Sequence, residues 1–279
     1  MSQTRIAYIP LATYPEAVAD GSILAAAGFA ASLECALHVT TFAVDIPQVS
    51  SSWGSLLVDI PGLVHAAEEK SKAECQRLQG LVQGAAGSRV KVHCASREVA
   101  LAGALDAAAT EARYFDLAVL PWSDESLGAQ DMAQAIVFGS GRPTILVPPS
   151  ARPASLNHIA VAWDGSRVAA RALGDALQLL AKGDRVSVLT VQDEKSLSRS
   201  DLADALASSL EKRGLSATPL GITLGQKTIA ETLQDTALSE GAQLLAMGGF
   251  GHSRIRDFIL GGATKGVLTQ LQLPTLLSH

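Results

Sequence analysis

The same order of predicted strands and helices occurs twice along this chain. A short apolar run over residues 5–10 has a counterpart over 158–163, and an alanine-rich helical pattern follows each run. Both halves then alternate strands with helices and close on similar segments, Pro-Thr-Ile-Leu-Val at 143–147 and Pro-Thr-Leu-Leu at 274–277. Self-similarity over this length is typical of a tandem duplication, so we expect two copies of one domain.

The spacing of the apolar residues predicts the elements of each copy. Further strands are expected over 38–44, 89–95, 116–120, 185–191, 217–224 and 242–247, and helices over 17–37, 62–82, 99–114, 167–181, 201–212, 229–239 and 264–271. Strands that alternate with helices indicate βαβ units, and continuous apolar strands are expected where helices cover both faces of a parallel sheet. We therefore predict an α/β protein with two tandem, doubly wound, five-stranded parallel sheets, each with strand order 3-2-1-4-5.

The segment 148–153 contains three prolines and is typical of a linker. It predicts one domain over residues 1–150 and a second over 151–279. The closing strands, 143–147 and 274–277, are short and apolar and are expected at sheet edges, where they are free to pair. We expect them to join the two domains as a pseudo-dimer within one chain, and a homodimer of whole chains also stays open.

Composition excludes several classes of protein. The hydrophobic content of 48% suffices for a core, and a net charge of −5 is not typical of proteins that bind nucleic acid or anionic membranes. No stretch is apolar enough to span a bilayer, and no secretion signal is evident at the start. We expect a cytoplasmic protein whose three cysteines stay reduced, with no membrane or nucleic-acid partner.

Candidate binding residues cluster in the second copy. Ligands of such sheets bind beyond the carboxyl ends of the strands, where the strand order reverses. The first strand there ends in Asp164-Gly-Ser, and Gly248 and Gly251 follow the fourth strand. From Gly261 the chain runs Gly-Gly-Ala-Thr into a helix, whose first amides and dipole favour an anion. A carboxylate opposite, at Asp164, can accept hydrogen bonds from an adenine amino group or a ribose hydroxyl.

Each of these features also has a purely structural interpretation. Asp-Gly-Ser is a common turn in which the acid caps a helix, and the glycines can serve turns alone. Both interpretations stay open for each feature by itself. Their joint placement at the switch point favours a ligand site.

The spacing Gly248-x2-Gly251-x9-Gly261, with Asp164 after the first strand, resembles the ATP-binding motif of the universal stress protein family. The resemblance, in a tandem two-domain form, implies a Rossmann-like fold of the adenine nucleotide alpha hydrolase type. It implies ATP or AMP as cofactor, with or without Mg²⁺, bound by Trp163, Asp164, Val191, Met247, Gly248, Gly251, Gly261, Gly262, Ala263 and Thr264. The family usually has Ser or Thr directly after the third glycine, whereas this chain has Gly262, and Thr264 matches a second hydroxyl position.

The first copy lacks this pattern. It has no glycine pair after its fourth strand and no acid after its first, and Trp122 stands where we align Gly248. We expect the indole to fill the space of a nucleotide, so that the first copy binds none and serves as scaffold or partner surface.

Three functions remain open. The first is a stress-response sensor or regulator that binds an adenine nucleotide in its second domain. The second is a slow ATPase or a phosphoryl- or nucleotidyl-transfer enzyme, which needs an acid to hold a metal, and Asp257 is the one candidate near the predicted phosphates. The third is an interaction module without nucleotide. No catalytic set and no metal-ligand spacing is found among the histidines and cysteines.

Overall fold

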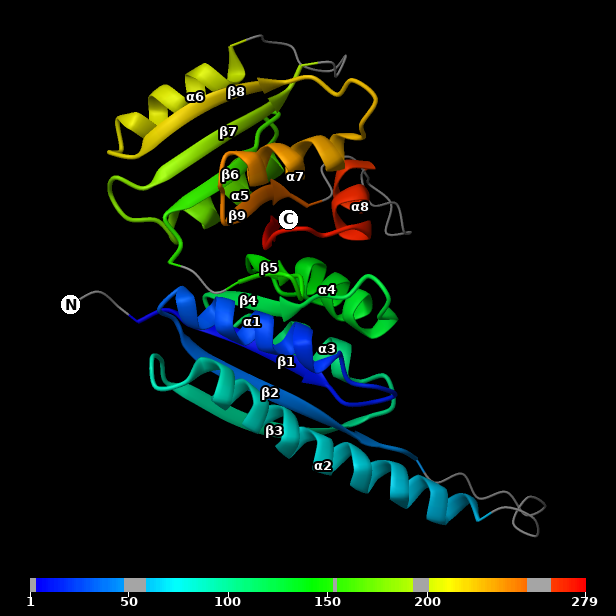
Figure 1. Ribbon diagram of the computed structural model, residues 1–279. Coiled ribbons are helices and arrows are strands. Elements are labelled where there is room, and N and C mark those ends of the chain that lie inside the picture. The colour runs from blue at the N-terminus through cyan, green and yellow to red at the C-terminus, as the bar shows by residue number, and fades with distance from the viewer. Residues whose placement is uncertain (1–3, 48–58, 153–154, 193–200, 250–261) are drawn as a thin grey trace.

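The computed structural model describes residues 4–47, 59–152, 155–192, 201–249 and 262–279 (Figure 1). The elements of the first half are β1 Ile6–Ala12, α1 Asp20–Ser32, β2 Ala36–Asp45, α2 Ile60–Ala86, β3 Val92–Ala100, α3 Ala104–Ala112, β4 Leu117–Pro121, α4 Leu127–Gly139 and β5 Thr144–Val147. Those of the second half are β6 His158–Ala162, α5 Arg167–Leu177, β7 Arg185–Val191, α6 Leu202–Glu211, β8 Ser216–Ile222, α7 Ile229–Ser239, β9 Leu244–Gly248, α8 Gly262–Thr269 and β10 Thr275–Ser278. The predicted order of elements is confirmed in both halves.

Two predicted helix boundaries are wrong by five residues, and each of these errors has a local cause. The helix predicted over 17–37 ends at Ser32, because the backbone of Glu34 takes a positive φ of 56° and turns the chain into β2. The helix predicted from residue 99 starts at Ala104. Val99 and Ala100 instead extend β3, where they pair with Val44 and Asp45 of β2.

The ten strands of the described residues lie in one sheet, in the order β3-β2-β1-β4-β5-β10-β9-β6-β7-β8. Each half therefore has the predicted order 3-2-1-4-5, and every strand pair within a half is parallel. The strands predicted to lie at edges, β5 and β10, pair with each other antiparallel and join the halves. They lie at the centre of the molecule, with the C-terminus beside β5 (Figure 1).

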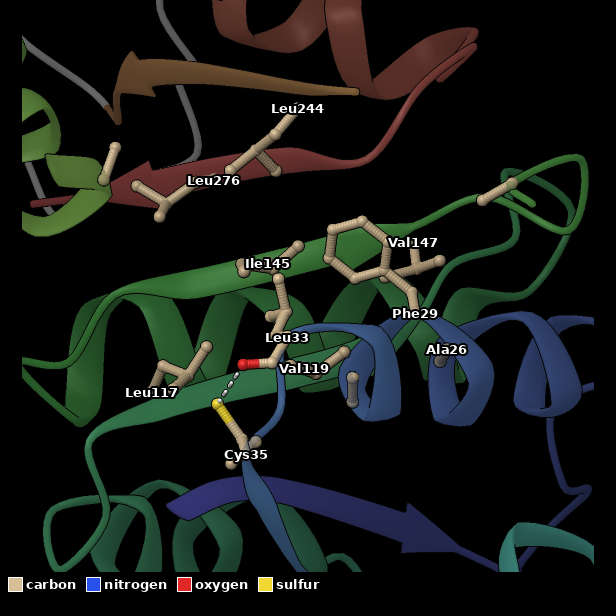
Figure 2. Packing of buried hydrophobic residues seen from close by; sticks show 14 of the residues in the cluster. Ala26, Phe29, Leu33, Cys35, Leu117, Val119, Ile145, Val147, Leu244 and Leu276 are labelled. Atoms are coloured by element: carbon tan, nitrogen blue, oxygen red, sulfur yellow. Dashed lines mark hydrogen bonds between the residues drawn. The ribbon is translucent and has the colours of Figure 1, made fainter. Parts of the chain in front are cut away.

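The apolar core is divided by the faces of the sheet and not by the two halves. One cluster packs the strands against α1, α2, α5 and α6, and the other packs them against α3, α4, α7 and α8. Side chains alternate between the two, so that Ala7 and Ile9 face the first cluster while Tyr8 faces the second. Ile145 and Val147 of β5 share the first cluster with Leu244 and Leu276 of the second half, as Figure 2 shows. The boundary at residue 150 therefore stays a prediction, because the core is continuous across it.

The three cysteines are free thiols, as expected for reduced residues. Cys35 is fully buried and lies 3.6 Å from the carbonyl oxygen of Leu33, to which it donates a weak hydrogen bond (Figure 2). Burial raises the pKa of Cys35, Cys75 and Cys94, which disfavours the reactive thiolate. No helix in the described part of the chain is long and apolar enough to cross a membrane.

The seam between β5 and β10 yields a test of the shared core. Ile145 is opposite Leu276 in the pairing register, and both side chains are at most 1% exposed. We expect Ile145→Ala and Leu276→Ala each to lower the free energy of unfolding by about 2–5 kcal/mol, because each leaves a cavity in the packed core. The measurement is urea unfolding followed by circular dichroism.

The matched control is Leu24→Ala, whose side chain is 42% exposed on α1 and which should change the free energy of unfolding by about 0.5 kcal/mol or less. The double variant should lose less than the sum of the two single losses, since the residues are neighbours. Seam variants as stable as wild type would contradict a core shared across β5 and β10.

Candidate functional site

The sheet order of the second half changes direction at β6. This strand pairs with β7 on one side and with β9 on the other, both parallel, so the carboxyl ends of three strands lie side by side. Asp164 follows β6, Val191 ends β7 and Gly248 ends β9. The structure therefore brings these three predicted site residues to one edge of the sheet, at the switch point.

Asp164 is exposed and belongs to the turn between β6 and α5. Its Oδ1 accepts a hydrogen bond of 2.8 Å from the backbone N–H of Ser166, and the Ser166 hydroxyl in turn caps α5 by accepting from the N–H of Ala169. Gly165 between them has a φ of +75°, which favours glycine. The predicted turn is thus confirmed, but the residue that caps α5 is Ser166 and not the acid. The turn engages one carboxylate oxygen of Asp164. Among described residues no hydrogen bond to Oδ2 is found.

Trp163 precedes this turn and is held by β7. Its backbone N–H donates to the carbonyl of Leu189 at 2.8 Å, and its carbonyl accepts from the Thr190 hydroxyl at 3.0 Å. Both backbone groups of Trp163 are therefore hydrogen-bonded to β7, which fixes the start of the turn that carries Asp164. Thr190 was not among the predicted site residues, and its one signal in the sequence was a hydroxyl near the end of an otherwise apolar strand.

Val191 and Met247 contribute to the core beside the site. Val191 is 7% exposed and Met247 is 4% exposed, and both belong to the cluster on the α7 and α8 face. Their side chains hold the ends of β7 and β9 in place, so any contact with a ligand would fall mainly to their backbone atoms.

Gly248 is required by packing. A β-carbon at this position would lie 2.7 Å from Cγ2 of Val168 and 2.8 Å from the backbone nitrogen of Ala169, both in the first turn of α5. Glycine is thus the residue that lets the start of α5 approach the end of β9. The adjacent Gly249 differs, because its nearest neighbour would be the carbonyl oxygen of Ser278 at 3.5 Å.

Only some of the remaining predicted site residues belong to the part of the chain that the structure describes. Gly251, Gly261 and the candidate metal-holding acid Asp257 lie outside the described residues. Gly262, Ala263 and Thr264 form the first turn of α8, as the predicted helix start requires, although the helix begins two residues earlier than predicted. Within the described ranges, no group of three potential metal ligands occurs.

A cavity of about 400 Å³, which was not predicted from the sequence, lies at the carboxyl end of β8. It is lined by Thr223, Leu224, Gly225, Gln226, Lys227, Thr232, Asp235 and Thr236. The Lys227 ammonium contacts Oδ2 of Asp235 at 2.7 Å, so the charge of this lysine is balanced within the cavity wall.

Strand pairing corrects our alignment of the first half. Ala118 of β4 pairs with Thr144 of β5, and Leu245 of β9 pairs with Thr275 of β10. The two threonines hold the same place in the repeated Pro-Thr segments, so Ala118 and Leu245 are counterparts. Ala118 also pairs with Tyr8 of β1 and Leu245 with Ala160 of β6, so Tyr8 and Ala160 are counterparts too. Counting three residues on from Ala118 and from Leu245, Pro121 is the counterpart of Gly248, so the alignment of Trp122 with that glycine is wrong. The indole of Trp122 is 4% exposed and packs into the core on the α3 and α4 face.

The same register identifies the other counterparts. Asp164 corresponds to Ala12, because Asp164 lies four residues after Ala160 and Ala12 lies four residues after Tyr8, the counterpart of Ala160. Val191 corresponds to Phe42, which pairs with Ala12. At the three strand ends where the second half offers Asp164, Val191 and Gly248, the first half carries the apolar residues Ala12, Phe42 and Pro121.

Comparison with known proteins agrees with this architecture. Residues 155–279 match the model of the universal stress protein family. The whole chain is similar to the crystal structure of a universal stress protein from Archaeoglobus fulgidus DSM 4304, with a TM-score of 0.71, 14% identity, and coverage of 97% of this chain and 95% of that one. A search of curated proteins found no match.

A putative universal stress protein from Pseudomonas aeruginosa UCBPP-PA14 is also similar, with a TM-score of 0.52, 13% identity, and coverage of 99% of this chain and 93% of that chain. At these identities the structural likeness establishes the fold. The predicted resemblance to the universal stress protein family is confirmed by the family match over residues 155–279, and the predicted α/β fold is confirmed for the whole chain.

The two adjacent glycines after β9 provide a matched test of packing. In the absence of nucleotide, we expect Gly248→Ala to lower the free energy of unfolding by about 1–3 kcal/mol, because the new methyl group would overlap the backbone of α5. Gly249→Ala should be neutral or slightly stabilising, since its methyl group meets ordinary contacts and restricts the unfolded chain. Urea unfolding of the two variants in nucleotide-free buffer measures the difference, and equal stabilities would contradict this role of Gly248.

Proposed function

We propose that the second half of this chain, which matches the universal stress protein family, binds one adenine nucleotide, ATP or AMP, and that the protein acts as a nucleotide-dependent regulator in a stress response. The observation that carries the proposal is the placement of Asp164, Val191 and Gly248 on three adjacent strand ends at the switch point. This is where parallel α/β sheets bind their ligands.

The described residues fit the nucleoside part of such a ligand. Asp164 offers an exposed carboxylate whose Oδ1 alone is engaged by a described donor, which leaves acceptor capacity for an adenine amino group or a ribose hydroxyl. The carboxylate is held in place, because Ser166 and Thr190 fix the turn on either side of it. Preorganisation of this kind lowers the entropic cost of binding.

The phosphates are assigned by the sequence motif. In the proposal they lie against the backbone of Gly251, Gly261 and the first turn of α8, whose amide groups need no positively charged side chains to hold an anion. This agrees with the acidic net charge of the chain, −5. When bound, Mg²⁺ would be held mainly by the phosphate oxygens of ATP.

Asp164→Asn tests the nucleoside contact. The amide keeps an oxygen that can accept from the N–H of Ser166, so the turn is preserved, but the charged acceptor is lost. We expect the Kd for ATP and for AMP to rise by about 10- to 100-fold, since hydrogen bonds to a charged group are worth about 1.5–3 kcal/mol. Isothermal titration calorimetry measures the affinity and the stoichiometry, which should be one nucleotide per chain.

The control is Glu211→Gln, which changes a carboxylate at the far end of α6 and should leave the Kd unchanged. Gly251→Val and Gly261→Val should abolish binding while circular dichroism stays unchanged. Wild-type affinity in all three site variants would place the nucleotide elsewhere, and two nucleotides per chain would contradict its restriction to the second half. Release of phosphate or AMP in the same samples would favour the enzyme over the regulator.

A further inference from the structure

A cavity of about 790 Å³ opens in the first half, at the edge where its strands end. It is lined from the ends of β1, β2, β3 and β4 and from the starts of α1, α3 and α4. The counterparts of the proposed nucleotide site, Ala12, Phe42 and Pro121, all line it, whereas Trp122 does not. Our expectation that the indole fills this space is therefore wrong, and the crevice of the first half is open.

The loop between β1 and α1 explains why space remains. In the second half only residues 163–166 connect β6 to α5, and the first turn of α5 packs onto Gly248. In the first half residues 13–19 make the same connection, so α1 begins farther along the chain and Pro121 needs no close approach of a helix. Residues of this longer connection, Tyr14 to Ala19, form one wall of the cavity.

The inner wall of the cavity is apolar. Leu11, Ile23, Leu78 and Leu120 contribute side chains that are at most 2% exposed. Large apolar side chains also stand exposed in its lining: Tyr14 is 40% exposed, Leu101 52% and Leu127 75%. Exposing such side chains to water is unfavourable, and a ligand that covers them would recover this free energy. The volume lies within the range of about 300–1,000 Å³ that is usual for small-molecule sites.

The charged residues of the lining indicate the sign of the charge on the ligand. Glu16, Glu125 and Asp131 are exposed carboxylates of the wall, and the lining contains no Lys, Arg or His. The start of α4 offers no strong anion site either, because the Ser126 hydroxyl already accepts from the N–H of Ala129. Carboxylates without a balancing cation repel phosphates and fatty acids and attract a positive charge.

We propose that this cavity binds a cationic amphiphile, a molecule with an aliphatic or aromatic body and an ammonium head group. The apolar body lies against Leu11, Phe42 and Leu120, and the head group lies at the mouth near the three carboxylates. The proposal concerns the first half and does not depend on nucleotide binding by the second half.

Titration calorimetry with three probes of equal chain length tests the proposal: decyltrimethylammonium, decanol and decanoate, each below its micelle concentration. We expect the ammonium to bind with one equivalent per chain and at least about tenfold more tightly than decanoate, with decanol in between. Saturating ATP should leave this binding unchanged, which separates the outcome from that of the proposed nucleotide site. A wild-type protein that binds neither the ammonium nor decanol, or that prefers decanoate, would overturn the proposal.

Two sets of variants locate the site. Ala104→Trp, in the first turn of α3, fills the cavity and should abolish binding of all three probes, while Ala73→Trp on the exposed side of α2 outside the lining should not. The triple variant Glu16→Gln, Glu125→Gln, Asp131→Asn changes only exposed side chains and should remove the preference for the ammonium over decanoate while decanol still binds. Unchanged affinities in both the filled and the neutralised variants would show that the probes bind elsewhere.

Discussion

The antiparallel pairing of β5 with β10 determines the arrangement of the rest of the molecule. Both strands are four residues long and fully buried, and they turn two parallel sheets into one sheet of ten strands. Because each half is parallel within itself, the reversal at the seam makes the strands of the two halves run antiparallel to each other where they meet. The two switch points therefore lie at opposite ends of the central strand pair, and the two crevices share no wall.

Within this sheet the crevices of the two halves carry different residues at matching positions. The second half presents Asp164 and Gly248 at its strand ends, and the first half presents Ala12 and Pro121 at the matching positions. Neither change disturbs the sheet, since Pro121 pairs with Val147 of β5 as Gly248 pairs with Ser278 of β10. A duplicated domain can in this way keep its core and alter its ligand.

Much of the fold followed from the sequence. Runs of apolar residues located every strand, and the repeat gave the order of elements and the 3-2-1-4-5 arrangement. The pairing of 143–147 with 274–277 was also expected from their short apolar character. The predicted helix boundaries were wrong where the backbone of Glu34 turned the chain or where an apolar pair, Val99 and Ala100, fitted a strand as well as a helix.

The site was harder to predict, because its geometry depends on the pairing register of the strands. From the sequence we aligned Trp122 with Gly248, and only the pairing of β4 with β5 and of β9 with β10 shows that Pro121 belongs there. The cavity of the first half was missed for a related reason, since the sequence does not reveal how far α1 stands from β4.

The contact between Gly248 and α5 bears on how such sequences are compared. A glycine that is fixed by the packing of a helix would persist in a descendant that had lost its ligand, so its presence by itself is poor evidence of binding. The evidence in the second half is its placement beside Asp164 and Val191 at the switch point. The length of the connection between the first strand and the first helix is more informative: residues 163–166 bring the helix onto the strand end, while residues 13–19 leave it clear. Sorting duplicated chains of this architecture by that length would separate, on the amino-acid sequence alone, crevices in which the first helix packs on the end of the fourth strand from crevices in which it begins farther along the chain.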